Sequence, residues 1–319
     1  MTDSLIYKMI MTNSSLNEIL DSACRSIQDQ IGSGKVANYI PALARVDIKK
    51  FGASILTLDG ESASFGDAHE SFSIQSISKV FSLALVLNQI GDKLWERVHH
   101  EPSGNAFNSI VQLEMERGIP RNPFINAGAL VLSDILLKDR TPETSIQTIL
   151  NFLHEINGEG RIGIDHEVAL SELENAHRNA SLVHFMKSCN NIENAVSDVL
   201  EVYCNHCSIS MSCEELCRSM LFLAKEGFDP ISNKKIISPE LARRINSIMM
   251  LCGHYDASGD FAYRVGLPGK SGVGGGIVVI VPEVGVITVW SPGLNNNGNS
   301  LVGTSALEAI AKISNWNIL

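Results

Sequence analysis

The chain has 319 residues, of which 45% are hydrophobic and 19% charged, a balance typical of a folded globular protein. Its formal net charge of −10 makes a phosphate backbone or an anionic membrane an unfavourable main partner, so we expect neither nucleic-acid nor membrane binding. The sequence contains no run of about 18 consecutive apolar residues, which excludes a predicted membrane-spanning helix.

The N-terminus and the cysteines together predict a cytoplasmic protein. Residues 1–15 contain Asp3 in place of a basic leader and lack a small-residue cleavage site, so we interpret them as an N-terminal extension and not as a signal peptide. The seven cysteines are odd in number and unevenly spaced, which is typical of reduced thiols. Two close pairs, Cys204/Cys207 and Cys213/Cys217, could suggest zinc, but only five residues separate them and core-facing cysteines on helices have the same spacing. We predict no metal and no other cofactor.

The N-terminal part predicts one helix and then two strands. In residues 14–32 apolar side chains recur at three- and four-residue spacing after two serines that could cap a helix. Residues 51–58 are strand-like, Asp59-Gly60 is a turn signal, and residues 61–65 return as a second strand.

A long helical stretch follows, from about Ser73 to Cys252. Residues 77–90 are apolar on nearly every side and end at Gly91, which predicts a helix in the interior. Further helices are predicted at 126–138, 143–156, 180–188, 192–204, 212–226 and 238–251.

Strand patterns return near the C-terminus. The β-branched runs 277–281 and 286–290 are separated by a hairpin-like turn, and residues 298–316 close the chain with a helix. This order predicts an α/β protein of the α+β type, with an antiparallel five-stranded sheet flanked by helices and an all-helical lobe inserted. We expect one domain over 16–319, with a sheet subdomain of about 16–72 and 253–319, a lobe of about 73–252, and the catalytic groups in the cleft between them.

Ser76 and Lys79 are the first candidate catalytic pair. Residues three apart on a helix share a face, so the Lys79 amine can reach the Ser76 hydroxyl. A lysine kept neutral by burial can take the serine proton, and the N-terminal end of the helix favours the developing anion. A second Ser-x-x-Lys, Ser232 to Lys235, lies in a polar turn, and we interpret it as solvated surface. The Ser76–Lys79 pair indicates a serine acyl enzyme only if a partner motif accompanies it.

Residues 270–276, Lys-Ser-Gly-Val-Gly-Gly-Gly, are the candidate partner motif. A phosphate-binding loop is excluded, because Arg264 stands where that motif needs glycine and a strand follows where it needs a helix. A Lys-Ser-Gly edge strand is similar to the Lys-Thr-Gly element of serine acyl enzymes. Its glycines let a substrate approach the backbone, where a main-chain N–H can bind an oxyanion. The alternative is an ordinary glycine-rich turn.

Several polar residues have an open interpretation. Asn126 begins an apolar helix, where it is a good N-cap without a further role. Glu172 and Asn179 are seven residues apart and share a face if one helix spans both, as ligand contacts or as surface residues. Three tyrosines are by default half-buried packing residues with hydrogen-bonded hydroxyls: Tyr39, Tyr203 and Tyr255.

Taken together, the motifs resemble the serine-dependent glutaminases. The likeness runs from about Leu16 to Ile313, and six segments carry it in the family's order: residues 35–41, 75–79, 101–105, 122–129, 252–259 and 266–273. Asn38 departs from the pattern, since family members often have aspartate there, and the stretch before Leu16 is an extension. The resemblance implies a β-lactamase/transpeptidase-like fold, L-glutamine as the substrate, no cofactor, and a homo-oligomer that is a dimer or a tetramer.

The resemblance also implies roles for individual residues. Ser76 corresponds to the nucleophile, Lys79 to its activating base, and Tyr255 to the tyrosine that shuttles a proton to the departing ammonia. The backbone N–H groups of Ser76 and Val273 correspond to the oxyanion hole. The implied substrate-binding set is Tyr39, Ser76, Asn126, Glu172, Asn179, Tyr203, Tyr255 and Val273.

Two other functions stay open at this point. A β-lactamase or penicillin-binding peptidase would use the same fold, although the missing export signal counts against it. A non-catalytic amino-acid sensor would keep the pocket without the chemistry, but the intact Ser76, Lys79 and Tyr255 count against that function.

Overall fold

The computed structural model describes residues 15–104, 106–158 and 161–318. Nearly all of the N-terminal extension, together with Asn105 of the 101–105 motif, lies outside the described residues. Within the described ranges, no helix is both long enough and apolar enough to cross a membrane.

A five-stranded antiparallel sheet joins the two ends of the chain. Its strand order is β2-β1-β10-β9-β8, with two strands from the N-terminal part and three from the C-terminal part, which confirms the predicted sheet. The strands are β1 Gly52–Thr57, β2 Ser62–Gly66, β8 Gly269–Ser271, β9 Gly276–Val281 and β10 Gly285–Trp290. Strand β1 pairs with β10, so that Ile55 lies opposite Ile287. This pairing joins the N-terminal and C-terminal parts of the chain, which the long insert separates in sequence.

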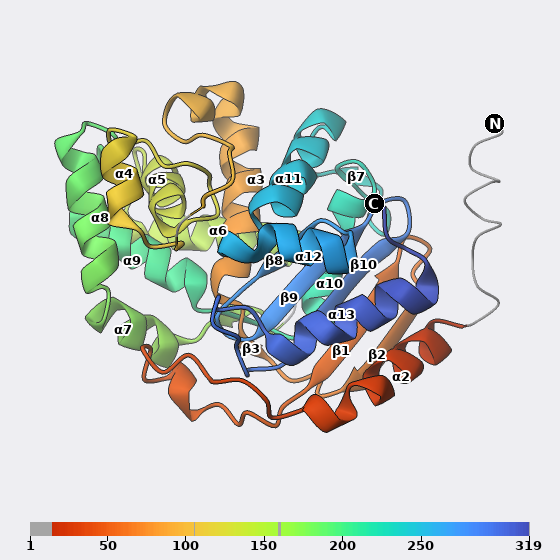
Figure 1. Cartoon of the computed structure of the whole chain (residues 1–319). Helices are drawn as coiled ribbons and strands as arrows, with labels where there is room; N and C mark the ends of the chain where they lie inside the picture. Colours follow the sequence, from red (N-terminus) through yellow and green to blue (C-terminus); the bar gives the residue numbers. More distant parts are fainter. Residues whose placement is uncertain (1–14, 105, 159–160, 319) are drawn as a thin grey trace.

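Helices cover both faces of this sheet, so its central strands are largely apolar. Ile277 and Val279 of β9 face a core shared with α2 (Leu16–Ser26) and α13 (Leu301–Ser314). Val278 and Ile280 face the opposite core, to which α10 (Cys213–Ala224) contributes. Figure 1 shows α2 and α13 lying across one face of the strands. All residues of β9 and β10 are therefore buried, as in sheets that helices sandwich.

In the sequence, the remaining helices lie between β2 and β9. Figure 1 shows α4, α5, α8 and α9 gathered beside the sheet. Their bounds are α3 Ser78–Ile90, α4 Ile110–Met115, α5 Asn126–Leu136, α6 Pro142–Asn157, α7 His166–Glu174, α8 His177–Ser188, α9 Val196–Cys207, α11 Pro239–Cys252 and α12 Ser258–Val265. Single-turn or short 3₁₀-helices lie at Gln28–Gln30, Leu43–Arg45, Gln75–Ile77, Gly91–Glu96 and Tyr255–Ala257. The helix predicted inside the protein is α3, and its first seven residues are all buried.

The prediction of an all-helical insert is wrong in one respect, because short strands lie within it. A three-stranded sheet and a separate hairpin consist of β3 Phe72–Ser73, β5 Ile209–Met211 and β4 Gly163–Ile164, and of β6 Phe228–Asp229 and β7 Lys234–Lys235. Strands of two or three residues are too short for a repeating pattern, so periodicity cannot reveal them.

The predicted N-terminal helix is shorter than expected, whereas the predicted surface turn is confirmed. The helix predicted over 14–32 ends at Ser26, since Ile27 leaves the helical conformation (φ −112°, ψ 5°) and a 3₁₀ turn follows. The polar turn with the second Ser-x-x-Lys is confirmed as surface, because Ser232 and Lys235 are both exposed at the β6–β7 hairpin.

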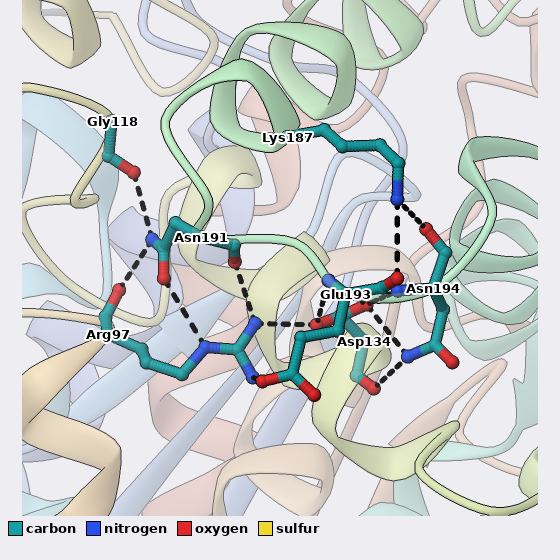
Figure 2. Close-up of polar contacts among 7 residues, drawn as sticks. All are labelled: Arg97, Gly118, Asp134, Lys187, Asn191, Glu193 and Asn194. Carbon is teal, nitrogen blue, oxygen red and sulfur yellow. Dashed lines mark hydrogen bonds and ion pairs between the residues drawn. The ribbon is translucent and has the colours of Figure 1, made fainter.

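A buried polar network ties helix α5 to the segment that joins α8 to α9 (Figure 2). The Asp134 carboxylate is fully buried and accepts hydrogen bonds from Arg97 Nη2 at 2.5 Å and from the backbone N–H of Asn194 at 2.9 Å. The Asn191 side-chain amide donates to the carbonyls of Arg97 and Gly118, both at 2.9 Å. The network holds four separate segments together with donors and acceptors that are mostly shielded from water.

Replacing Asp134 with alanine should lower the free energy of unfolding by about 3–5 kcal/mol, because it leaves a partly buried guanidinium and several N–H groups without their acceptor. Urea denaturation measures the change. Asp92→Ala is the matched control, since the Asp92–Arg244 pair is mostly exposed and should contribute less than about 1 kcal/mol. Equal losses in the two variants would contradict a structural role for the network.

Candidate active site

Ser76 lies in a tight turn between strand β3 and helix α3. The single-turn helix Gln75–Ile77 contains it, and Gln75 has a left-handed backbone with φ 51°. The segment after β8 packs directly on this turn: a Cβ placed on Gly272 would lie 2.4 Å from the Ile74 carbonyl oxygen and 3.3 Å from the Ser76 nitrogen. Only glycine permits that approach. The backbone that carries Val273 is thereby held beside Ser76.

The Lys79 amine is buried at the base of the site. Its Nζ donates hydrogen bonds to the Asn126 Oδ1 at 2.8 Å and to the Phe124 carbonyl at 3.2 Å. In the described part of the chain its hydrogen bonds go to these two acceptors and not to the Ser76 hydroxyl. Burial lowers the pKa of Lys79 from 10.5 to about 8, because the charged amine loses its hydration. At pH 7 about a tenth of the amine is therefore neutral and able to accept a proton, far more than for an ordinary lysine.

Asn126 faces the site and does not cap its helix, so the N-cap prediction is wrong. The N-cap of α5 is Ile125, and Asn126 is the first helical residue. Its Oδ1 is occupied by Lys79, and its Nδ2 donates to the Asn179 Oδ1 at 3.0 Å. The side-chain amide that could have capped the helix is used to link α3, α5 and α8.

Glu172 and Asn179 lie on two different helices, so the condition that one helix spans both is not met. Helix α7 ends at Glu174 and α8 begins at His177, and both side chains nevertheless reach the same pocket. Glu172 accepts a hydrogen bond from the Gln75 Nε2 at 3.3 Å. Burial raises the pKa of Glu172 from 4.5 to about 7, and the Gln75 hydrogen bond opposes that rise.

Tyr255 is a further neighbour of Ser76 and has a left-handed backbone, with φ 57°. Its hydroxyl interacts with the Ser76 side chain and donates to the Ser271 carbonyl at 3.5 Å. Its ring lies 4.6 Å from the Phe107 ring, between centroids, and the Lys270 Nζ lies 4.6 Å from its centroid. Burial raises the pKa of Tyr255 to about 12, so the phenol keeps its proton at neutral pH.

A pocket of about 100 Å³ gathers most of the predicted residues. Those that line it are Tyr39, Ser76, Asn126, Glu172, Asn179, Tyr203 and Val273. Lys79 and Tyr255 do not line this pocket, and the Lys79 Nζ lies 5.8 Å from the centroid of the Tyr203 ring. Tyr39 is half exposed, at 54%, whereas Tyr203 is buried. A wider groove of about 670 Å³ adjoins the pocket and shares Tyr39, Phe107 and Val273 with it.

Sequence reasoning missed several lining residues. Gln75 precedes the nucleophile candidate, but its left-handed turn and its bond to Glu172 have no local signature. Phe107, Asn108 and Arg178 also line the pocket and belong to no motif with a chemical rationale of its own. The only available signal was their closeness in sequence to residues that the resemblance singles out.

The cysteines and acidic residues do not form a metal site in the described part of the chain. No group of three or more histidine, cysteine, aspartate or glutamate side chains is arranged to hold a metal ion there. All seven cysteines are free thiols, and the two pairs considered for zinc are buried on α9 and α10.

Comparison with known proteins identifies the family. The model of the glutaminase family matches residues 34–319. The chain belongs to the glutaminase family. A glutaminase from Rhizobium leguminosarum bv. trifolii (strain WSM2304) is 53% identical over 303 residues, which cover 95% of this chain and 98% of the relative. The resemblance drawn from the motifs is thereby confirmed.

Solved structures agree in fold. A probable glutaminase from Bacillus subtilis complexed with 6-diazo-5-oxo-L-norleucine is 32% identical, with a TM-score of 0.87 over 97% of this chain and 99% of that one. A second structure, of a Bacillus subtilis glutaminase in covalent complex with 5-oxo-L-norleucine formed by reaction with the same compound, matches with a TM-score of 0.87 and 32% identity over 96% and 100% of the two chains. The enzyme is a glutaminase, a hydrolase that acts on glutamine, and the lactam-hydrolase and sensor alternatives are set aside.

The buried amine predicts a pH-dependent stability. Between pH 8 and 10.5 the unfolded chain keeps a proton on Lys79 that the folded enzyme has released, so the free energy of unfolding rises with pH in that window. A Lys79→Met variant lacks this dependence. The stability of the unmodified enzyme minus that of the variant should therefore rise by about 3 kcal/mol from pH 8 to pH 10.5. Urea denaturation at the two pH values measures it, and a constant difference would contradict the lowered pKa.

Proposed function

We propose that the enzyme hydrolyses L-glutamine through a covalent acyl-enzyme on Ser76. The neutral Lys79 amine takes the proton of the Ser76 hydroxyl as its oxygen attacks the side-chain amide carbon of glutamine. The negative charge that develops on the amide oxygen is bound by the backbone N–H groups of Ser76 and Val273. The lowered pKa of Lys79 supports this base, because an amine with a pKa of about 8 can be neutral near the working pH.

Collapse of the tetrahedral intermediate breaks the carbon–nitrogen bond. The departing nitrogen needs a proton, which the Tyr255 hydroxyl delivers, and the proton that Lys79 took from Ser76 then restores the phenol. Ammonia leaves, and the γ-glutamyl group stays on Ser76 as an ester. Water then attacks that ester with Lys79 again as the base, which releases glutamate and restores the serine. The contact between the Tyr255 and Ser76 side chains supports this path.

Glu172 is the proposed partner of the substrate ammonium group. A buried carboxylate is suited to that task, because a cation in the same pocket stabilises its ionised form. The neutral side chains of Asn179, Tyr203 and Tyr39 would bind the substrate carboxylate, and Asn126 would orient the amide end. Their presence on the wall of one pocket supports the assignment.

The observation that carries this mechanism is that Ser76 lines the small pocket, that the buried Lys79 amine is bonded to Asn126 of the same pocket wall, and that the Tyr255 hydroxyl interacts with the Ser76 side chain. The covalent complex of the Bacillus subtilis relative is consistent with it. In 5-oxo-L-norleucine the ketone stands at the carbon that bears the amide in glutamine, so a bound analogue presents that carbon where a nucleophile can react.

We extend three further expectations as proposals. The fold is of the β-lactamase/transpeptidase type, with residues 16–72 and 253–319 as the sheet subdomain and 73–252 as the lobe. The free, mostly buried thiols support a cytoplasmic location. The family resemblance supports a homo-oligomer, either a dimer or a tetramer.

Ser76→Ala should abolish the release of glutamate and ammonia from L-glutamine, because no other group in the pocket can form the acyl-enzyme. Coupled assays of both products measure activity, and calorimetry should still detect glutamine binding. Ser82→Ala, which removes another buried hydroxyl from α3, is the control and should stay active. Substantial turnover by Ser76→Ala would refute the nucleophile.

Glu172→Gln should raise the KM for glutamine by about tenfold or more with a smaller change in kcat, because it removes the charge that binds the ammonium group. Glu167→Gln makes the same change on the exposed face of α7 and should leave both constants unchanged. A KM equal to that of the unmodified enzyme would count against the role of Glu172.

A further inference from the structure

The backbone at Tyr255 needs external support. A non-glycine residue at φ 57° lies in the left-handed region, which costs roughly 1–2 kcal/mol and persists only where neighbouring contacts hold it. The peptide unit that precedes Tyr255 consists of the His254 carbonyl and the Tyr255 N–H. A hydrogen bond to this carbonyl fixes the orientation of the peptide plane before Tyr255. That plane and the φ angle of Tyr255 together set the direction in which the phenol points.

Asn299 is the side chain that binds the His254 carbonyl. It is 3% exposed, and its Nδ2 donates to the His254 oxygen at 3.2 Å. Its Oδ1 accepts a hydrogen bond from the Ser271 hydroxyl at 2.5 Å. Its own backbone is held in turn, because its N–H donates to the Asn295 Oδ1 at 3.1 Å. One amide thus joins the turn before Tyr255 to strand β8 and to the loop that leads into α13.

The same strand also contacts the Tyr255 side chain. The Ser271 carbonyl accepts from the Tyr255 hydroxyl at 3.5 Å and from the Lys270 Nζ at 2.6 Å. The Lys270 amine lies 4.6 Å from the centre of the Tyr255 ring and donates a second bond to the Gly253 carbonyl at 3.1 Å. Tyr255 is therefore contacted at its ring, at its hydroxyl and at the backbone before it. Asn299 links the hydroxyl contact to the backbone contact, because it bonds both to Ser271 and to the His254 carbonyl.

We propose that Asn299 is a positioning residue that aligns the Tyr255 hydroxyl with the departing nitrogen. It acts through the His254 carbonyl and Ser271 and does not line the pocket in which the substrate binds. The inference rests on the proton-delivery role proposed for Tyr255. Within the turn, the His254 carbonyl also accepts from the Ala257 N–H at 3.0 Å, so Asn299 supplies the side-chain bond that ties this carbonyl to β8. Without the Asn299 amide that tie is lost, and the phenol is less well aligned with a nitrogen that must gain a proton before the bond breaks.

Two substrates distinguish positioning from a general loss of structure. Hydrolysis of L-glutamine needs a proton on the leaving nitrogen, whereas the γ-(4-nitrophenyl) ester of L-glutamate expels a phenolate that needs none. Asn299→Ala should lower kcat/KM for glutamine by about 10- to 100-fold, and for the ester far less, so that the ester-to-amide ratio rises about tenfold or more. A ratio equal to that of the unmodified enzyme would overturn the inference.

Two further variants separate the possible failures. Tyr255→Phe should raise the same ratio, and if it does not, the proton role of Tyr255 fails. If Tyr255→Phe raises the ratio and Asn299→Ala does not, only the positioning role fails. Asn191→Ala removes another buried amide, in the network of Figure 2, and should lower stability while leaving the ratio unchanged.

Ser271→Ala keeps the inference testable if Asn299→Ala does not fold. It removes only the hydroxyl that binds the Asn299 Oδ1 and leaves the bond from Nδ2 to His254 in place. A smaller rise in the ester-to-amide ratio is expected, and no rise would count against the link through β8.

Discussion

The buried amine of Lys79 constrains much of the site around it. An ammonium group without water is unstable in the interior unless acceptors surround it, and here the acceptors come from the start of α5. Asn126 supplies one of them and passes a hydrogen bond on to Asn179, so the need to satisfy one nitrogen fixes how three helices meet. The same lack of water lowers the pKa of the amine to about 8. Burial of the amine therefore determines how the helices around the pocket are connected. It also lowers the pKa of Lys79 into the range that suits a base.

Strained backbone flanks the nucleophile on two sides. Gln75 and Tyr255 both have left-handed conformations, and neither is a glycine. Each has a contact from elsewhere in the chain: Gln75 through its side-chain bond to Glu172, and the Tyr255 turn through Asn299. Conformations of this kind persist where the surrounding structure over-determines them, and they gather at sites that need fixed geometry. The close packing of Gly272 on the Ser76 turn brings the two strained segments together.

The sheet provides the rigid frame for this arrangement. Pairing of β1 with β10 joins the N-terminal hairpin to the C-terminal strands, and β8 at the edge of the sheet carries Lys270 and Ser271 to the site. Helix α10 covers one face although it belongs to the long insert, so sheet and insert share a single core. The polar network around Asp134 fixes the opposite end of α5, away from Asn126 (Figure 2). Helix α5, which contributes Asn126 to the pocket, is thus held near both of its ends.

The sequence by itself determined the elements that depend on local patterns. The apolar run of α3, the β-branched runs of β9 and β10, and the Ser-x-x-Lys and Lys-Ser-Gly motifs are all contained in short segments, because helix and strand periodicities repeat within a few residues. With the family resemblance, they were enough to predict the main sheet, the activity and seven of the residues that line the pocket.

Only the tertiary structure decided how those residues are used. Asn126 serves Lys79 and not its own helix, Glu172 and Asn179 come from two helices, and Asn299 reaches the turn before Tyr255. Each of these contacts joins segments far apart in the chain, so no local pattern contains it. The hydrogen bonds form because burial leaves every polar group in need of a partner, and which partner lies within reach is a property of the packed fold.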